Sequence, residues 1–283
     1  MVSSRVFQPL LVRIGLIVIV PAVVIWAIAG PLAALIGGGA LLAAEIWRVR
    51  RAVTTGMPDR LEFIPSRPAD HPWVDTEAFR GELEALGELG FHPVADYRVA
   101  YPGAPDGLAR VLVNPESLVY AEVNQTRTKA GATPVATTLI STMSDGWSLQ
   151  TTSREPVPLS VAFMQTPRAM WRSLPQAAPP DLLSDHLALR DRAAQDLQVS
   201  VGGDGTLNGF FALQQIEHQA RRAAVLETNI LRGLARGVAC ERNTPTQWLG
   251  EYAVPPAPEP AGEGAPAPGG SGVVTAQNPQ RAS

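Results

Sequence analysis

The stretch ARVLVNPESLVYAEVN, residues 109–124, contains two runs rich in valine, leucine and tyrosine that are joined by Asn-Pro-Glu. Such runs, separated by turn-forming residues, are typical of β-strands joined by a tight turn. Similar runs occupy residues 96–101, 137–143 and 147–153. Because the connections between the runs are short, we expect a small antiparallel β-meander rather than a sheet built through crossovers.

Helical patterns flank the predicted sheet. Thr76–Leu89 repeats apolar residues at helical spacing and is followed by Gly90, a common helix stop. Residues 181–197 predict a second helix, and a long C-terminal helix is expected from Leu207 to about Val238. The apolar stripe expected in the second helix is Leu183, Leu187, Ala194 and Leu197. The fold class predicted for residues 76–250 is therefore α+β, a meander packed with helices.

Three segments rich in proline are expected to lie outside regular structure. Residues 50–75 predict a linker, and residues 251–283 predict a disordered tail because they hold too little apolar bulk to order themselves. Residues 154–180 predict a connection with exposed large side chains. These side chains are Phe163, Met164, Met170 and Trp171. They either cover the sheet, which we favour, or dock on a bilayer or a protein partner.

An uncharged apolar block extends from Ile14 to Ala44. It is long for one membrane span of about 20 residues and short for two ideal spans. The pair Gly30-Pro31 lies in its middle, and this pair breaks helices. We therefore expect a transmembrane helical hairpin over residues 10–49 with its turn near residues 29–31, after an N-terminal tail of residues 1–9. A single span is one alternative, and a secretory signal peptide cleaved near Ala27–Ala29 is another.

The charges around this block predict its orientation. Arginines flank both ends, whereas the predicted turn carries no charge. The flanking residues are Arg5, Arg13, Arg48, Arg50 and Arg51. Under the positive-inside rule both ends of a hairpin lie in the cytoplasm, so the later domain faces the cytoplasm at the inner cell membrane. The use of arginine in place of lysine is typical of GC-rich bacterial genomes. Gly37–Gly39 is expected to let the two helices approach closely.

The composition excludes several classes of protein. A net charge of -3 argues against nucleic-acid binding, which needs a concentrated basic surface. The single cysteine, Cys240, excludes an internal disulfide and a cysteine metal cage. We expect Cys240 to be a small buried residue.

Acidic residues near histidines are candidate metal ligands. His71 lies between Asp70 and Asp75, but no second histidine stands at ligand spacing, so a solvated loop is favoured. His186 lies beside Asp185 on a helix, where a solvated face is likewise favoured. One alternative is a metal held by Asp181 and Asp185 beside His186, and another is an inter-helix site formed by His186 and His218. Ser144–Gly146, Ser-Asp-Gly, predicts a hairpin turn rather than a catalytic group. The sequence thus predicts no catalytic residue, no cofactor site and no metal site.

The string VSVGGDGTLNG, residues 199–209, is the most specific motif in the chain. Its part GGDGTLN resembles the signature of diacylglycerol and sphingosine kinases. That resemblance implies that Gly202–Thr206 line the phosphates of ATP. The resemblance covers seven residues, and the chain around them departs from the family: a meander precedes the motif, and little sequence follows it. We therefore favour a connector between two helices in which Asp204 or Thr206 caps the second helix.

Together these patterns predict a membrane-anchored bacterial protein of a non-enzymatic kind, namely a scaffold, sensor or accessory subunit. Its expected partners are the lipid bilayer and a protein, either another chain or a second copy of itself. The alternative is a lipid or nucleotide kinase-like protein that uses Gly202–Thr206.

Overall fold

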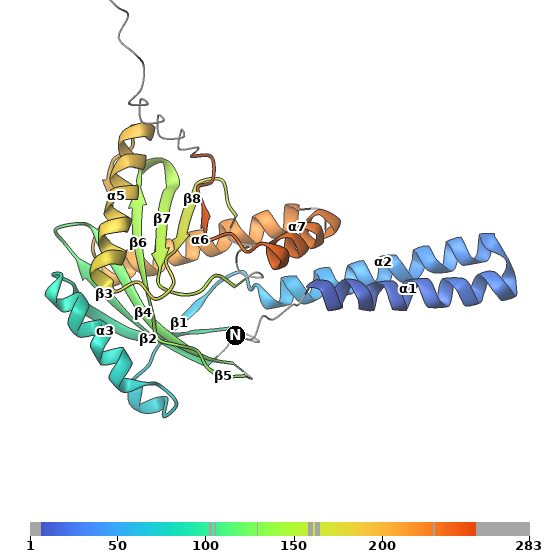
Figure 1. Ribbon diagram of the computed structural model, residues 1–283, viewed down its shortest axis with the longest axis horizontal. Coiled ribbons are helices and arrows are strands. Elements are labelled where there is room, and N and C mark those ends of the chain that lie inside the picture. The colour runs from blue at the N-terminus through green and yellow to red at the C-terminus, as the bar shows by residue number, and fades with distance from the viewer. Residues whose placement is uncertain are drawn as a thin grey trace, which may run out of the picture. The chain divides into compact units, whose positions relative to one another are not determined.

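The computed structural model describes residues 7–101, 104, 106–128, 130–157, 161, 165–228 and 230–252. Ten strands in this part of the chain form one sheet (Figure 1). Along the sheet the order is β1 Glu62–Pro65, β2 His92–Ala100, β3 Asp106–Asn114, β4 Val119–Thr128, β6 Ala136–Met143, β7 Trp147–Thr152, β8 Ala169–Ser173 and β10 Gln247–Trp248. Two further strands, β5 Gly131–Ala132 and β9 Val201–Gly202, pair with β4 and β6.

The predicted hairpin of β3 and β4 forms the middle of the sheet. Its register pairs Ala109 with Asn124 and Asn114 with Val119. The Asn114 side chain accepts hydrogen bonds from the backbone N–H groups of Glu116 and Ser117, at 3.1 and 3.0 Å. A side-chain acceptor of this kind substitutes for a backbone acceptor in a turn. The turn predicted at Asn-Pro-Glu is therefore confirmed.

The sheet is mixed, so the prediction of a purely antiparallel meander is wrong in one place. Strand β8 runs parallel to β7, with Leu149 opposite Met170. A parallel neighbour cannot be joined by a tight turn, and residues 153–168 separate these two strands along the chain. Met170 and Trp171 are 0% and 4% exposed, so they belong to the core and not to an exposed segment. Phe163 and Met164 lie outside the described residues.

The segment expected as a linker contributes the edge strand β1 and the short 3-10 turn η1, Pro68–Asp70. Strand β1 pairs antiparallel with β2, and Phe63 lies opposite Val99. The Phe63 ring also stacks on the ring of Phe211, with 4.2 Å between the centroids. Burial of an aromatic ring explains why this proline-rich stretch joins the sheet.

The two faces of the sheet bury different helices (Figure 1). Helices α3, Thr76–Glu88, and α5, Pro179–Leu197, cover one face, with Phe79 and Leu182 packed against Val123 of β4. Helix α6, Leu207–Glu227, covers the other face, where Phe210 packs against Tyr120 of the same strand. Successive side chains of a strand point to opposite faces, so β4 contributes to both cores. The predicted helix Thr76–Leu89 is confirmed, and Gly90 follows it with φ +82.

Helix α5 presents a different face from the one predicted. The buried residues are Pro179, Leu182, His186, Arg190 and Ala193. Leu183 and Leu187 are only partly buried at the edge of the core. The buried face is thus shifted by about one residue from the predicted apolar stripe. Hydroxyl groups of the sheet bind His186 and hold this polar side chain at the centre of the interface between α5 and the sheet.

The long C-terminal helix is interrupted. Helix α6 ends at Glu227, and helix α7, Ile230–Arg242, begins after a break. At the break Thr228 has an extended backbone, with φ -70 and ψ 129. Its hydroxyl donates to the carbonyl of Ala224 at 2.6 Å. A β-branched residue that bonds the preceding turn in this way ends a helix readily.

Two N-terminal helices, α1 Phe7–Ala29 and α2 Pro31–Gly56, meet at Gly30, which has φ +88. They lie side by side in Figure 1. The break predicted at Gly30-Pro31 is present. A Cβ atom added at Gly38 would lie 3.3 Å from Cβ of Ala22, which confirms the close approach of the helices.

Within the described part of the chain, Val12–Ala29 is the one segment that has the length and apolarity to cross a membrane. Its mean hydropathy is 2.5, and none of it is buried inside the protein.

At the C-terminal end, the structure describes the first two residues of the predicted tail, Glu251 and Tyr252. Tyr252 is 4% exposed, and its hydroxyl donates to Asp196 of α5 at 2.6 Å. The remainder of the predicted tail, residues 253–283, lies outside the described residues.

Candidate functional site

The glycine-rich loop connects α5 to α6. Its strand β9 is antiparallel to β6, with Gly202 opposite Thr142. The Thr206 side chain caps α6 by accepting from the N–H of Gly209 at 3.0 Å. The Asp204 carboxylate accepts from the N–H and the hydroxyl of Thr206 at 2.9 and 2.8 Å. The predicted capping role of Thr206 is confirmed.

This loop differs physically from a phosphate cradle. A cradle offers free N–H groups at a helix N-terminus to an anion. Here the carboxylate of Asp204 lies at that end of α6, 2.0 Å from where a Cβ atom of Gly209 would stand. The backbone hydrogen bond from Thr206 holds the pKa of Asp204 below its usual value. A negative group therefore already lies where a phosphate would bind, and it would repel one.

Asp204 is also tied to the sheet. The hydroxyl of Tyr120 in β4 donates to Asp204 at 2.8 Å. Burial, and after it the hydrogen bond to Asp204, raises the pKa of Tyr120 to about 12. Tyr120 thus stays protonated and continues to donate at any physiological pH.

His186 lies inside the protein, so the solvated face predicted for it is wrong. It is 0% exposed. Its Nε2 lies 2.8 Å from the hydroxyl of Ser141, and its Nδ1 lies 2.9 Å from the hydroxyl of Thr151. Burial, and after it the nearby charge of Arg190, lowers the pKa of His186 to about 3. The ring is therefore a neutral hydrogen-bonding group of the core.

The remaining metal candidates lie apart. His218 contacts the carbonyl of Pro58 at 2.6 Å, so it does not join His186. Asp185 forms an ion pair with Arg172 at 2.9 Å, and Asp181 is exposed. Within the described ranges, no three His, Cys, Asp or Glu side chains lie close enough to hold a metal ion.

Two other candidates have structural positions. Ser144–Gly146 forms the turn between β6 and β7, with Asp145 at φ +59. Cys240 is 4% exposed and packs with Trp171 and Val161. Burial raises the pKa of its thiol, which disfavours the thiolate that a nucleophile needs.

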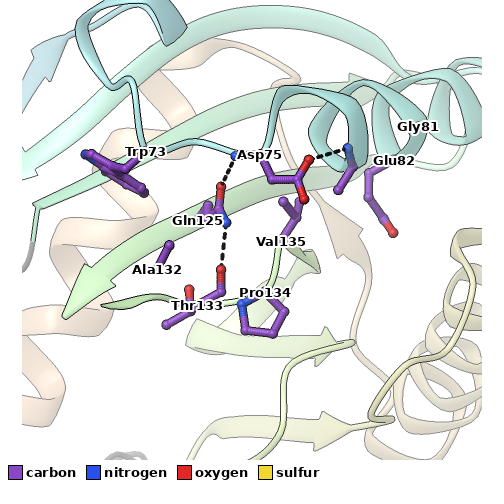
Figure 2. Close-up of a pocket in the computed structure, with 10 residues that line it drawn as sticks. Trp73, Asp75, Gly81, Glu82, Gln125, Ala132, Thr133, Pro134 and Val135 are labelled. Atoms are coloured by element: carbon purple, nitrogen blue, oxygen red, sulfur yellow. Dashed lines mark hydrogen bonds between the residues drawn. The ribbon is translucent and has the colours of Figure 1, made fainter. Parts of the chain in front are cut away.

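A hollow of about 640 Å³ opens between α3 and the segment that joins β5 to β6 (Figure 2). Gln125 fixes its floor: its side-chain oxygen accepts from the N–H of Asp75 at 2.8 Å, and its amide donates to the carbonyl of Thr133 at 2.7 Å. The residues that line the hollow are Trp73, Asp75, Ala78, Gly81, Glu82, Gln125, Ala132, Thr133, Pro134 and Val135.

The chemistry of the hollow is acidic and aromatic. Asp75 caps α3 by accepting from the N–H of Ala78 at 3.0 Å, and Glu82 accepts from the hydroxyl of Thr137 at 2.6 Å. Both carboxylates thus line the hollow, and Trp73 lies at its other end from Glu82 (Figure 2). Carboxylates and an aromatic ring in one hollow favour a cationic group.

Beside the hollow, the structure brings together three side chains that the sequence did not connect. His71 is 6% exposed, so the solvated loop predicted for it is wrong. Its Nε2 lies 2.7 Å from Oγ of Ser66, and its Nδ1 lies 3.3 Å from Oδ1 of Asp106. The other oxygen of Asp106 accepts from Nε1 of Trp73 at 2.8 Å.

The sequence does not predict this group because its carboxylate comes from another element of the fold. Ser66 and His71 flank the turn η1, but Asp106 begins strand β3. The proximity of Ser66 to His71 gives only a weak signal, and Asp70 and Asp75 are nearer in sequence. Pairing of β1 with β2, and of β2 with β3, is what delivers Asp106.

Comparison of the chain with protein-family models, with curated proteins and with solved structures finds no match.

Proposed function

We propose that this chain is a membrane-anchored bacterial protein that acts as a scaffold, sensor or accessory subunit through its α+β domain. The observation that carries the proposal is the apolar surface of α1. None of the segment Val12–Ala29 is buried, and Ile19 and Ile28 are 62% and 82% exposed. An apolar helix that finds no protein core needs another apolar environment, and a bilayer core supplies one.

A two-span hairpin accounts for both N-terminal helices. Helix α2 also exposes large apolar side chains at its start, namely Leu32, Leu35 and Ile36. Gly37 and Gly38 contact α1, as small residues do where membrane helices pack closely. The carboxylate of Glu45 pairs with Arg48 of the same helix at 2.7 Å, which reduces the cost of placing it near the interface.

The arginines on both flanks favour a domain in the cytoplasm at the inner membrane. The segment that follows α2 is held by α6. His218 and Arg222 contact the carbonyls of Pro58 and Met57, at 2.6 and 3.0 Å, and Arg222 also pairs with Asp59 at 2.7 Å. These contacts fix the segment that follows the anchor, residues 57–59, to helix α6, which covers the sheet. Such a link suits a domain that acts at a fixed distance from the membrane.

The hollow at α3 supports a role in binding a protein partner. Its two carboxylates and the Trp73 ring match a lysine or arginine side chain of a partner segment. A second copy of the chain is the alternative occupant. No observation in the described residues favours the kinase-like alternative, because Asp204 lies where a phosphate would bind.

Reporter fusions after Val53 and after Ser283 test the anchor. A hairpin gives cytoplasmic signal from both fusions, and the full chain stays in the membrane pellet after carbonate washing. Extracytoplasmic signal from both fusions would support the signal-peptide alternative and overturn the proposed location. A fusion after Gly30 distinguishes the two remaining topologies, because a hairpin places that position outside the cytoplasm and a break within one span does not.

Partner binding is tested by co-purification from detergent extracts of native membranes. We expect a partner to be recovered with the wild type and with Glu84→Gln, an exposed carboxylate on the same helix that pairs with Arg80. Trp73→Ala and Glu82→Gln should each lose it. Two differently tagged copies expressed together test self-association. Equal recovery with all variants would place the contact elsewhere, and absence of both a partner and self-association would refute the scaffold proposal.

A further inference from the structure

We propose that Ser66 is a nucleophile that His71 and Asp106 activate, and that it accepts an acyl group from an activated ester. The three side chains form a continuous path, Ser66 Oγ to His71 Nε2 at 2.7 Å and His71 Nδ1 to Asp106 Oδ1 at 3.3 Å. This inference goes beyond the proposed anchoring and partner binding and does not depend on either.

The partners of His71 decide its tautomer. A carboxylate only accepts hydrogen bonds, so the proton of the neutral imidazole belongs on Nδ1, which lies 3.3 Å from Oδ1 of Asp106. Nε2 then carries a lone pair and accepts the hydrogen bond from the hydroxyl of Ser66. This is the protonation state in which a histidine acts as a general base toward a serine.

The orientation of the base is supported from a second side. Trp73 Nε1 donates to the other oxygen of Asp106, which helps to hold this carboxylate beside the imidazole. The Trp73 ring also meets the His71 ring edge to face, with 5.5 Å between the centroids. Trp73 thus contacts His71 and Asp106 and also lines the hollow.

The chain contains a matched comparison. Ser141 also lies within hydrogen-bond distance of a histidine, at 2.8 Å from Nε2 of His186. That histidine faces a second hydroxyl, Thr151, instead of a carboxylate, and both His186 and Ser141 are 0% exposed. Ser66, by contrast, is only half-buried and can be reached from solvent. A difference in reactivity between the two serines therefore isolates the effect of the carboxylate and of access.

The site contains a general base for Ser66, but the backbone N–H groups beside Ser66 do not stabilise an oxyanion. The N–H of Ser66 donates to the carbonyl of Asp96 at 3.2 Å, and the N–H of Arg67 donates to Asp70 at 3.2 Å. Both backbone donors next to the nucleophile are thus engaged. Since oxyanion donors contribute a large share of turnover, we expect slow, stoichiometric acylation of Ser66 rather than fast hydrolysis.

The step balances with p-nitrophenyl acetate as the acyl donor. Oγ of Ser66 attacks the carbonyl carbon, and its proton passes to Nε2 of His71. A bond forms between Oγ and the acyl carbon, and the bond between that carbon and the p-nitrophenolate oxygen breaks. His71 returns its proton to the departing phenolate or to water, so the products are O-acetyl-Ser66 and p-nitrophenol.

The test is acetylation of the full chain in detergent by p-nitrophenyl acetate at pH 8, followed by peptide mass spectrometry. We expect the acetyl group on Ser66 and a rate at that residue about 100-fold lower in His71→Gln, the usual contribution of a general base. Asp106→Asn, which changes an exposed side chain, should lower the same rate. Ser141→Ala should leave it unchanged.

Two results would overturn the inference. One is an unmodified Ser66 in folded wild-type protein, and the other is equal acetylation of Ser66 in the wild type, His71→Gln and Asp106→Asn. Circular dichroism of each variant confirms that the fold is intact before rates are compared. Anchoring and partner recovery are measured separately in Ser66→Ala, which should retain both.

Discussion

Polar side chains at the centre of packed interfaces distinguish this protein at the residue scale. His186 and Arg190 occupy positions on the buried face of α5 where leucine would be ordinary. Each has partners: the ring of His186 meets Ser141 and Thr151, and Arg190 donates to the carbonyl of Ser117. A buried polar group with its hydrogen bonds made costs little, but it ties stability to its protonation state.

His186 predicts a loss of stability in acid. The pKa of His186 falls from the usual 6.5 to about 3 in the folded protein. Between pH 6.5 and pH 3 the unfolded chain therefore binds a proton at this residue that the folded protein does not bind. Stability is therefore fully present above pH 6.5 and falls as the pH is lowered toward 3, by about 2 kcal/mol at pH 5. Chemical denaturation at pH 7 and pH 5 measures this.

The control for that prediction is His186→Gln, which keeps hydrogen-bonding capacity but does not titrate. We expect the variant to be less stable at pH 7 and to show a smaller difference between the two pH values. A pH dependence equal to that of the wild type would show that other groups cause it.

Thr206 gives a second prediction at this scale. Thr206→Ala removes the hydroxyl that caps α6, and loss of such a cap costs about 1 kcal/mol. Thr206→Ser keeps the hydroxyl and should retain most of the stability. Equal stability of all three proteins in urea denaturation would contradict the capping role.

At the scale of elements, α6 performs two tasks. It covers one face of the sheet through Phe210, and it holds the segment after α2 through Gln215, His218 and Arg222. The N–H of Leu61 donates to the side-chain oxygen of Gln215 at 2.9 Å, which places this contact directly before strand β1. A displacement of residues 57–61, which follow the anchor, is therefore expected to affect α6.

Hydrogen exchange tests that coupling. Arg222→Ala should increase amide exchange in residues 57–61 because it removes contacts to Met57 and Asp59. Arg232→Ala, an exposed arginine on α7, is the comparison and should leave that segment unchanged. Unaltered exchange in both variants would mean that Arg222 does not hold the segment.

The two N-terminal helices make a prediction about glycine. Gly38→Leu places a side chain against Cβ of Ala22, where an added Cβ atom already meets it at 3.3 Å, whereas Gly39 has nothing within 4 Å. Overpacking of this kind costs about 1–3 kcal/mol. Thermal melting of the full chain in detergent should therefore show destabilisation by Gly38→Leu and little change by Gly39→Leu. The reverse order would reject the observed packing of α1 on α2.

At the scale of the whole molecule, one sheet separates two interiors. Strand β4 alternates between them, since Val123 faces α3 and α5 while Tyr120 faces α6. The hollow and the Ser66 group lie with the first elements of the domain, and the glycine-rich loop lies at the start of α6. Trp73 belongs to both the part proposed to bind and the part proposed to react, since it lines the hollow and contacts His71 and Asp106.

Local pattern determined much of this architecture. The β3–β4 hairpin, the helix Thr76–Leu89, the break at Gly30-Pro31 and the cap at Thr206 follow from turn chemistry, periodicity and capping, which act within a few residues. The parallel placement of β8, by contrast, depends on the return of a distant segment. The face that α5 buries also depends on distant residues, because hydroxyl groups on β6 and β7 bind His186 of this helix.

The candidate sites divide in the same way. The sequence alone predicted that the loop 199–209 connects two helices, because glycine conformation and capping are local properties. It did not predict that His71 meets Asp106, or that Trp73 and Glu82 border one hollow with Gln125. Those contacts require the pairing of strands that are far apart in the chain. Local interactions can be inferred from neighbouring residues, but proximity across the sheet is decided only when the whole chain folds.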